Sequence, residues 1–354
     1  MRRAIIMPTL IAHGGAGGRP PASDRGARRS AILAAVQRGA DILRGGGSAL
    51  DAVVATVVVL ENDPLFNAGY GSVLTVAGRV EMDAAVMTAT RARRDNRGSA
   101  VGDNADGARV ALTSAARQRA GAAEVRLGGV VLVSRVRNPI ELARAVMERT
   151  PHLLMGAGGA ERLARQFGLR MCRPADLVSQ RARERWLASR GEPTGHLAHA
   201  GDGAPVSHGT VGAVAIDSHG DIAAATSTGG VSGKLPGRIG DSAIVGAGLF
   251  AGARGAASAT GEGEAIMRVA LCRQAVMALG RNRAQAAAER AIAIVADATA
   301  GQAGVIVVDS AGGLGYAHNA EVMEMALFHP IEGFRHRVLE PLALRTVPTR
   351  KPRK

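Results

Sequence analysis

The spacing of hydrophobic residues along the chain changes between two periods, and each change marks an expected helix or strand. Within residues 26–44, the apolar positions Ile32, Val36 and Leu43 recur at helical spacing. Three glycines from Gly45 would end that helix, and the Ser48 side chain is suited to cap the next one. The pattern predicts helices over residues 26–44, 49–61, 140–149, 160–167, 262–279 and 283–300.

Shorter apolar segments, bounded by glycine and polar residues, predict strands. A polar turn at 217–221 joins two of them into a hairpin, and 311–313 does the same later in the chain. The expected strands are 10–13, 80–87, 129–136, 210–216, 222–226, 304–309 and 314–318. Residues 169–208 are expected to be irregular, and 229–240 to form a glycine-rich loop. Because strands follow strands and helices follow helices, the order favours a layered α+β fold.

Length and charge change this picture less than their size suggests. A chain of 354 residues suits one or two domains and needs no disulfide to fold. The formal charge is +14, and its excess is concentrated in 89–126, 161–190 and 335–354. Only 3 of the 44 basic residues are lysines, a bias more typical of a GC-rich genome than of a binding surface. Since there are also few aromatic residues for base stacking, we expect no nucleic-acid partner.

The N-terminal residues resemble a weak signal peptide, because their apolar stretch is short and interrupted by Pro8. No apolar run approaches the ~20 residues of a membrane helix. Cys172 and Cys272 are far apart and give neither a disulfide framework nor zinc spacing. We therefore expect a cytoplasmic protein that has no membrane partner.

Two regions contain candidate chemistry. The first is the His13–Gly18 turn, where a dinucleotide fingerprint would need glycine at the position of Pro20, so a tight turn is the simpler interpretation. The second begins at Thr210, which starts an apolar strand directly after a polar linker and is followed by hydroxyl, Arg and Asp residues up to Glu264. Taken singly, each of these has an ordinary structural explanation, since threonine favours strands.

Taken together, the motifs resemble the isoaspartyl peptidase and plant-type L-asparaginase family of N-terminal nucleophile hydrolases. The resemblance rests on the ordered motifs at residues 13–17, 61–72, 82–84, 137–139, 209–214, 226–230, 235–241, 260–261 and 263–264. It implies an α+β fold of the four-layer αββα type in a single domain, residues 1–330. It further implies a precursor that cuts itself between Gly209 and Thr210 into an α chain (1–209) and a β chain (210–354), assembled as a dimer of αβ pairs.

The resemblance also implies roles in hydrolysing the aspartyl β-amide bond of a small molecule or dipeptide, L-asparagine or a β-aspartyl dipeptide. Thr210 would be the nucleophile, and its freed α-amine, with an ordinary pKa of about 7.7–8.0, would be its general base. Thr228 would tune the nucleophile, and Asn67 would lie beside it. Thr260 and Gly261 would form the oxyanion hole. Arg238 would bind the substrate α-carboxylate, and Asp241 would bind the α-ammonium.

No cofactor is expected to be required, although the loop 60–70 resembles the family's sodium-binding loop. A structural sodium ion would there be bound by backbone carbonyls. The candidate carbonyls are those of Leu60, Glu61, Asp63, Phe66, Ala68 and Tyr70.

The chain departs from the family pattern at three places. Residues 88–127 are expected to form a basic surface insertion, and 331–354 a basic C-terminal extension. Residues 319–323 lack the threonine and glycine usual in the family, which puts the local turn in doubt. Two alternative functions remain open. One is a glycosylasparaginase-like amidase, although that class normally has Asp where Gly209 stands; the other is a non-catalytic basic protein that binds polyanions.

Overall fold

The computed structural model describes residues 6–91, 123–189, 209–280, 283–339 and 341–342. The centre of the expected insertion, the stretch just before Gly209 and the last residues of the tail lie outside these ranges. No helix within them is long and apolar enough to cross a membrane.

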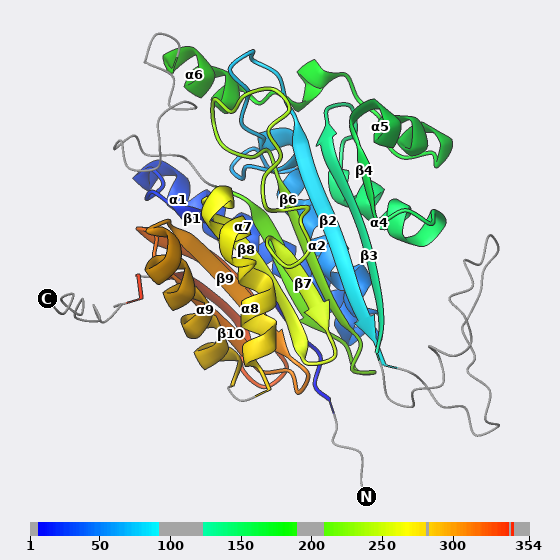
Figure 1. The fold of residues 1–354 in the computed structure, drawn as a ribbon, viewed down its shortest axis with the longest axis vertical. Coiled ribbons are helices and arrows are strands. Elements are labelled where there is room, and N and C mark those ends of the chain that lie inside the picture. The colour runs from blue at the N-terminus through cyan, green and yellow to red at the C-terminus, as the bar shows by residue number, and fades with distance from the viewer. Residues whose placement is uncertain (1–5, 92–122, 190–208, 281–282, 340, 343–354) are drawn as a thin grey trace, which may run out of the picture.

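The larger of two sheets has eight strands in the order β12-β11-β1-β5-β6-β2-β3-β4 (Figure 1). All neighbours are antiparallel except β3 and β4, which are parallel. The strands are β1 (Thr9–Gly17), β2 (Met82–Thr90), β3 (Glu124–Val133), β4 (Leu154–Gly156), β5 (Val211–Ile216), β6 (Ile222–Thr228), β11 (Val322–His329) and β12 (Gly333–Leu339).

The smaller sheet has four antiparallel strands in the order β10-β9-β8-β7. They are β7 (Leu249–Gly252), β8 (Gly255–Gly261), β9 (Ala303–Asp309) and β10 (Leu314–His318). This sheet lies against the larger one through contacts of β8 and β9 with β1 and β5. Apolar residues from both sheets, among them Ile11, Val214 and Ile306, form one buried cluster between them.

Helices cover the outer faces of both sheets. On the larger sheet lie α1 (Ala22–Arg44), α2 (Ala49–Glu61), α4 (Pro139–Arg149) and α5 (Ala157–Gln166). On the smaller sheet lie α7 (Gly263–Val269), α8 (Leu271–Ala278) and α9 (Ala284–Thr299) (Figure 1). Each covering layer has its own buried apolar cluster. The molecule is therefore a mixed α/β protein in which two facing sheets lie between two sets of helices.

Many of the predicted elements are confirmed. Ser48 caps α2, since its side chain accepts a hydrogen bond from the Asp51 N–H at 3.1 Å. Both predicted hairpins are present, and the glycine-rich loop 229–240 contains neither helix nor strand. The uncertain turn at 319–323 is held by Asn319, whose side chain accepts from the Ala303 N–H and donates to the Gly301 carbonyl.

Other predictions were wrong. The single helix expected over 262–279 is broken at Ala270, whose φ of 50° is incompatible with a continuing helix, so α7 and α8 are separate. The stretch 169–208, expected to be irregular, contains α6 (Gln180–Ala188). Strands β7 and β8 were missed because small residues such as those of β8 give little hydrophobic contrast. The expected extension begins with β12, which pairs with β11, and the described ends of the expected insertion belong to β2 and β3.

Candidate functional site

Thr210 lies where strands of both sheets end. It directly precedes β5, while Thr228 ends β6 and Gly261 ends β8. The Thr210 and Thr228 hydroxyl oxygens are hydrogen-bonded at 3.0 Å, and the Gly230 N–H donates to the Thr228 hydroxyl at 2.9 Å. A small cleft opens here, lined by Thr210, Thr228, Gly230, Val231, Arg238, Asp241, Gly261 and Gly263. The tertiary structure thus brings together five residues predicted separately from the sequence.

His13 is hydrogen-bonded to the backbone carbonyl of Thr210. Its Nδ1 lies 3.0 Å from the Thr210 carbonyl oxygen and its Nε2 lies 2.9 Å from the Ser258 hydroxyl. Since a carbonyl only accepts, Nδ1 bears the proton and Nε2 accepts from Ser258. Burial lowers the pKa of His13 to about 3, against a smaller opposing effect of the Thr210 carbonyl. The imidazole is therefore neutral at any working pH and orients Thr210 without adding charge.

Arg238 and Asp241, which we call the clamp, lie on the other side of the cleft. Arg238 donates through Nε and Nη2 to the Glu264 carboxylate, at 3.0 and 2.7 Å. Its Nη1 lies beside Gly230, where an added Cβ would come within 3.3 Å of it. The edge formed by Nη1 and Nη2 can therefore face a ligand in the cleft, while Nε stays paired with Glu264.

Asp241 is almost fully buried, and its Oδ2 has no hydrogen-bond partner among the described residues. Burial raises the pKa of this carboxyl to about 7, although the Arg238 charge lowers it. A buried carboxylate oxygen without a donor is costly, so the site is suited to a ligand that supplies a cationic N–H group. The clamp thus offers one partner for an anion and one for an ammonium.

The two residues predicted for the oxyanion hole differ in their surroundings. Gly261 lines the cleft, whereas Thr260 is fully buried and does not line it. The Thr260 hydroxyl oxygen accepts a hydrogen bond from the Ala16 N–H at 3.2 Å, which leaves its own proton free to donate. Both belong to the end of β8, opposite Ala303 and Gly304 of β9.

Asn67 lies against Gly209, the residue that precedes Thr210. A Cβ added at Gly209 would come within 2.8 Å of the Asn67 Cβ. The Asn67 amide donates to the Gly230 carbonyl at 2.6 Å and accepts from the Val73 N–H at 2.9 Å, so both ends are engaged. Asn67 thereby connects its own loop, Gly209 and the wall of the cleft.

Carbonyl groups of the loop 60–70 pack closely against Gly69 and Gly71. The Asp63 and Phe66 carbonyl oxygens lie 3.1 and 1.9 Å from the position of a Cβ on Gly71, and the Glu61 carbonyl oxygen lies 2.3 Å from that of Gly69. Backbone carbonyl oxygens are among the donors that a hard cation prefers. No group of three or more His, Cys, Asp or Glu side chains suited to a metal occurs in the described ranges.

The sequence analysis missed the side-chain role of Glu61. Its buried carboxylate accepts hydrogen bonds from Ser227 at 2.6 Å, from Asn138 at 3.1 Å and from the Ile140 N–H at 3.0 Å. Burial raises its pKa to about 8, against the lowering effect of these donors. Glu61 thus joins α2 and α4 to the strand residue next to Thr228.

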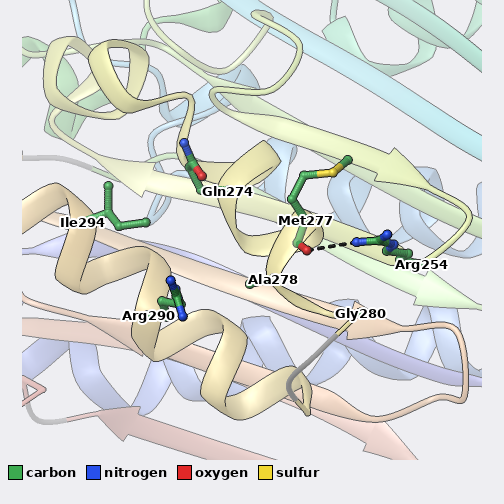
Figure 2. A pocket seen from close by; sticks show the side chains of 7 residues that line it. All are labelled: Arg254, Gln274, Met277, Ala278, Gly280, Arg290 and Ile294. Carbon is green, nitrogen blue, oxygen red and sulfur yellow. Dashed lines mark hydrogen bonds between the residues drawn. The ribbon is translucent and has the colours of Figure 1, made fainter.

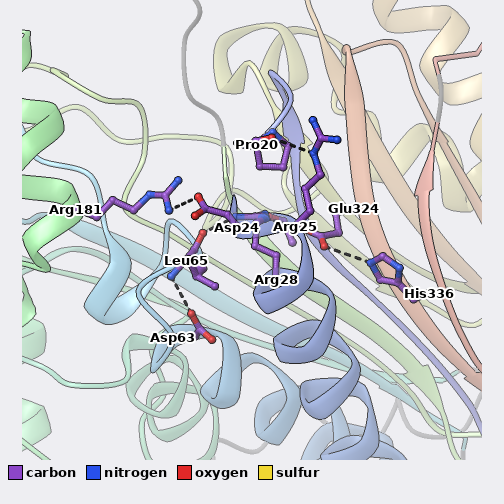
Figure 3. Close-up of polar contacts among 10 residues, drawn as sticks. Pro20, Asp24, Arg25, Arg28, Asp63, Leu65, Arg181, Glu324 and His336 are labelled. Carbon is purple, nitrogen blue, oxygen red and sulfur yellow. Dashed lines mark hydrogen bonds and ion pairs between the residues drawn. The ribbon is translucent and has the colours of Figure 1, made fainter. Parts of the chain in front are cut away.

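Arg28 is a second residue that no motif pointed to. Figure 3 shows its guanidinium among three segments. It donates to the Gly14 carbonyl at 3.0 Å, to the Leu65 carbonyl, and to Glu324 at 2.7 Å. His336 of β12 contacts the same Glu324 carboxylate at 3.3 Å. Arg28 therefore fixes the glycine turn after His13 against the loop that contains Asn67.

A second cleft, with a volume of about 400 Å³, lies between α8 and α9 (Figure 2). Its lining is Arg254, Gln274, Met277, Ala278, Gly280, Arg290 and Ile294. None of the residues predicted from the sequence belongs to it, so its size does not make it the candidate site.

The two contacting sheets, with a cleft beside the threonine that directly precedes β5, define a class of protein that comparison with known proteins identifies. The family model described as Asparaginase matches residues 6–102 and 120–332, and the chain belongs to this family. It is 37% identical over 309 residues to a Xenopus laevis protein named isoaspartyl peptidase/L-asparaginase, covering 87% of each chain. It is also 39% identical over 338 residues to the isoaspartyl peptidase of Salmonella typhimurium, covering 92% of this chain and 95% of the relative.

Proposed function

We propose that this chain is an autoprocessed threonine hydrolase that cleaves the aspartyl β-amide bond of L-asparagine and β-aspartyl dipeptides and releases L-aspartate. The observation that carries the proposal is the cleft itself. It sets the hydrogen-bonded hydroxyls of Thr210 and Thr228 opposite the Arg238 and Asp241 clamp. The names of the relatives support the same substrates.

The layering supports an αββα sandwich of the N-terminal nucleophile type. Two sheets face each other across one apolar cluster, and helices cover both outer faces with clusters of their own. In this arrangement the nucleophile starts a central strand of one sheet, and the oxyanion hole ends a strand of the other.

Self-cleavage would begin with attack of the Thr210 hydroxyl on the Gly209 carbonyl carbon. The acyl group moves from the Thr210 nitrogen to its oxygen, and water then hydrolyses the resulting ester. This frees the Thr210 α-amine and leaves Gly209 as a carboxylate. Asn67 packs so closely against Gly209 that a larger residue at position 209 would not fit. This close packing would help to hold the scissile carbonyl in place.

Hydrolysis would then use the freed amine as the base for the adjacent hydroxyl. The Thr210 oxygen attacks the substrate β-carbonyl, and the oxyanion receives hydrogen bonds from the Thr260 hydroxyl and the Gly261 N–H. Collapse expels ammonia or the amino group of the second residue, which takes a proton from the Thr210 ammonium. Water attacks the β-aspartyl ester and releases L-aspartate.

Recognition would depend on the clamp. The Nη1 and Nη2 edge of Arg238 pairs with the α-carboxylate, and the unpartnered Oδ2 of Asp241 accepts from the α-ammonium. Both groups are common to L-asparagine and β-aspartyl dipeptides, whereas an internal α-aspartyl residue has neither in free form. The clamp therefore selects the free zwitterionic end.

Two further properties are part of the proposal. A sodium ion would be held by backbone carbonyls of the loop 60–70 and would stiffen the segment that contains Asn67. The mature protein would form a dimer of αβ pairs.

The test is to purify the chain, follow its intact mass with time, and sequence the fragments. We expect two fragments, the smaller of which begins at Thr210, and hydrolysis of both L-asparagine and a β-aspartyl dipeptide. Kinetics on the two substrates side by side establish the preference. An intact protein that hydrolyses neither would overturn the proposal.

A further inference from the structure

Lys234 is the one lysine among the described residues, in a chain whose other basic residues are nearly all arginine. It is 1% exposed. Its Nζ donates to the Glu81 carbonyl at 2.8 Å. The space around the ammonium is tight, because a Cβ added at Gly230 would lie 3.0 Å from Nζ. A buried cation thus lies directly behind a glycine that lines the cleft.

Three hydrogen bonds join the glycine-rich loop 229–240 to residues 81–83, which we call the anchor segment. The first is the bond from Lys234 to the Glu81 carbonyl. The second is a hydrogen bond from the Gly237 N–H to the Glu81 carboxylate at 2.9 Å. The third runs from the Gly240 N–H to the Asp83 carboxylate at 3.1 Å. The loop is therefore attached at every third residue, and the clamp residues Arg238 and Asp241 each directly follow an attached glycine.

The buried charge of Asp83 in the anchor segment is balanced by that of Lys234 in the loop. Asp83 is fully buried at the start of β2, where burial raises its pKa and the Lys234 charge is the largest effect that lowers it. Burial in turn lowers the pKa of Lys234, and the Asp83 charge opposes this. A buried charge is costly without a counter-charge, so each of these residues supports the ionised form of the other.

We propose that Lys234 is a positioning residue for substrate recognition, one that fixes the loop on the anchor segment so that Arg238 and Asp241 bind the zwitterionic end of the substrate together. This inference rests on the proposed function and assigns its specificity to a residue that does not line the cleft. A compact ammonium fits behind Gly230, whereas the planar guanidinium that the chain uses almost everywhere else is larger. This accounts for a lysine, rather than an arginine, at this position of the chain.

The test compares Lys234→Met and Lys234→Arg with the parent protein. We would measure KM and kcat for a β-aspartyl dipeptide, follow self-cleavage of each chain, and determine L-aspartate binding by calorimetry. Arg79→Met is the matched control, because Arg79 is an exposed cation on the neighbouring turn. We expect both Lys234 variants to raise KM and weaken L-aspartate binding at least tenfold. We expect kcat to stay within about threefold and self-cleavage to persist, since Thr210 is held separately by His13 and Thr228.

The results distinguish this inference from the proposed function. An inactive parent protein would overturn both, whereas an active parent with an unchanged KM in Lys234→Met would overturn the inference alone. A folded Lys234→Met that no longer cuts itself would also overturn it, because the role would then lie in processing. A Lys234→Arg variant with the parent KM would contradict the requirement for a compact cation.

Removing Lys234 leaves Asp83 buried without its counter-charge, so the single variant could fail to fold. The double variant Asp83→Asn/Lys234→Met removes both charges and keeps an acceptor for a backbone N–H. It still lacks the bond to the Glu81 carbonyl, so we expect the same tenfold loss of L-aspartate binding. Binding equal to that of the parent would overturn the inference.

Discussion

The two sides of the cleft are built on opposite electrostatic principles. Around Thr210, the side chains of Thr228 and Ser258 are neutral, and burial keeps His13 neutral by lowering its pKa to about 3. The opposite side is densely charged: Arg238 and Asp241 line the cleft, Glu264 pairs with Arg238, and Lys234 and Asp83 lie behind them. In the proposed mechanism this difference separates bond cleavage from recognition, so we expect changes around Thr210 to affect kcat and changes on the charged side to affect KM.

The largest effect is expected from removal of the proposed nucleophile. We expect Thr210→Ala to stay uncut and to lose at least ~10³-fold in hydrolysis rate, because no other group supplies the attacking oxygen. Gel analysis and release of aspartate measure the two effects. Thr90→Ala removes an exposed strand hydroxyl and should behave as the parent. Cleavage at 209–210 in Thr210→Ala would contradict the role of this residue.

On the charged side, we expect Arg238→Met to raise KM about 100-fold with a small change in kcat. Each charge-assisted hydrogen bond contributes about 1.5–3 kcal/mol, and the variant loses those to the substrate carboxylate. Arg238→Lys keeps the charge but not the fork, and should raise KM about tenfold. Steady-state kinetics measure both values. An effect mainly on kcat would break the separation between the two sides.

The pH dependence sharpens the comparison, because Asp241 changes its charge near pH 7 whereas His13 stays neutral there. The raised pKa of Asp241, about 7, means that the ionised form needed for the substrate ammonium is present above this pH and lost below it. We expect KM to rise about tenfold between pH 8 and pH 6. The Asp241→Asn variant, measured over the same range, should bind weakly without this trend. A flat KM in the parent would contradict the assignment.

The smallest expected effect concerns Glu264, whose side chain is 59% exposed in its pair with Arg238. Exposed ion pairs contribute at most about 1 kcal/mol to stability. Glu264→Gln should lower KM about two- to threefold, since Arg238 then meets less competition for its charge. Thermal unfolding should change little. A large rise in KM would show that Glu264 orients Arg238 rather than competing with the substrate.

Much of the site could be predicted because its residues lie in short motifs with fixed spacing. The positions of Thr210, Thr228, Arg238 and Asp241 follow from such motifs, and the structure brings them to one cleft. The contributions of His13, Glu61 and Arg28 could not be predicted, since their partners are far away in sequence. Lys234 did leave a signal in the composition, as a lone lysine among arginines, but its meaning depends on a contact 153 residues away.

Local patterning sets what depends on neighbours along the chain. It determined the helix that begins after Ser48, the hairpin turns, and the order of the motifs. Tertiary structure alone decided the properties that depend on burial, because removal from water shifts the pKa of His13 to about 3 and that of Asp241 to about 7. It also decided which strand ends meet, since packing of the smaller sheet on the larger one brings the end of β8, with Gly261, to the ends of the β5–β6 hairpin where Thr210 and Thr228 lie. The sequence by itself thus determined which groups are available for the chemistry, and the packing of two sheets determined their charge and their partners.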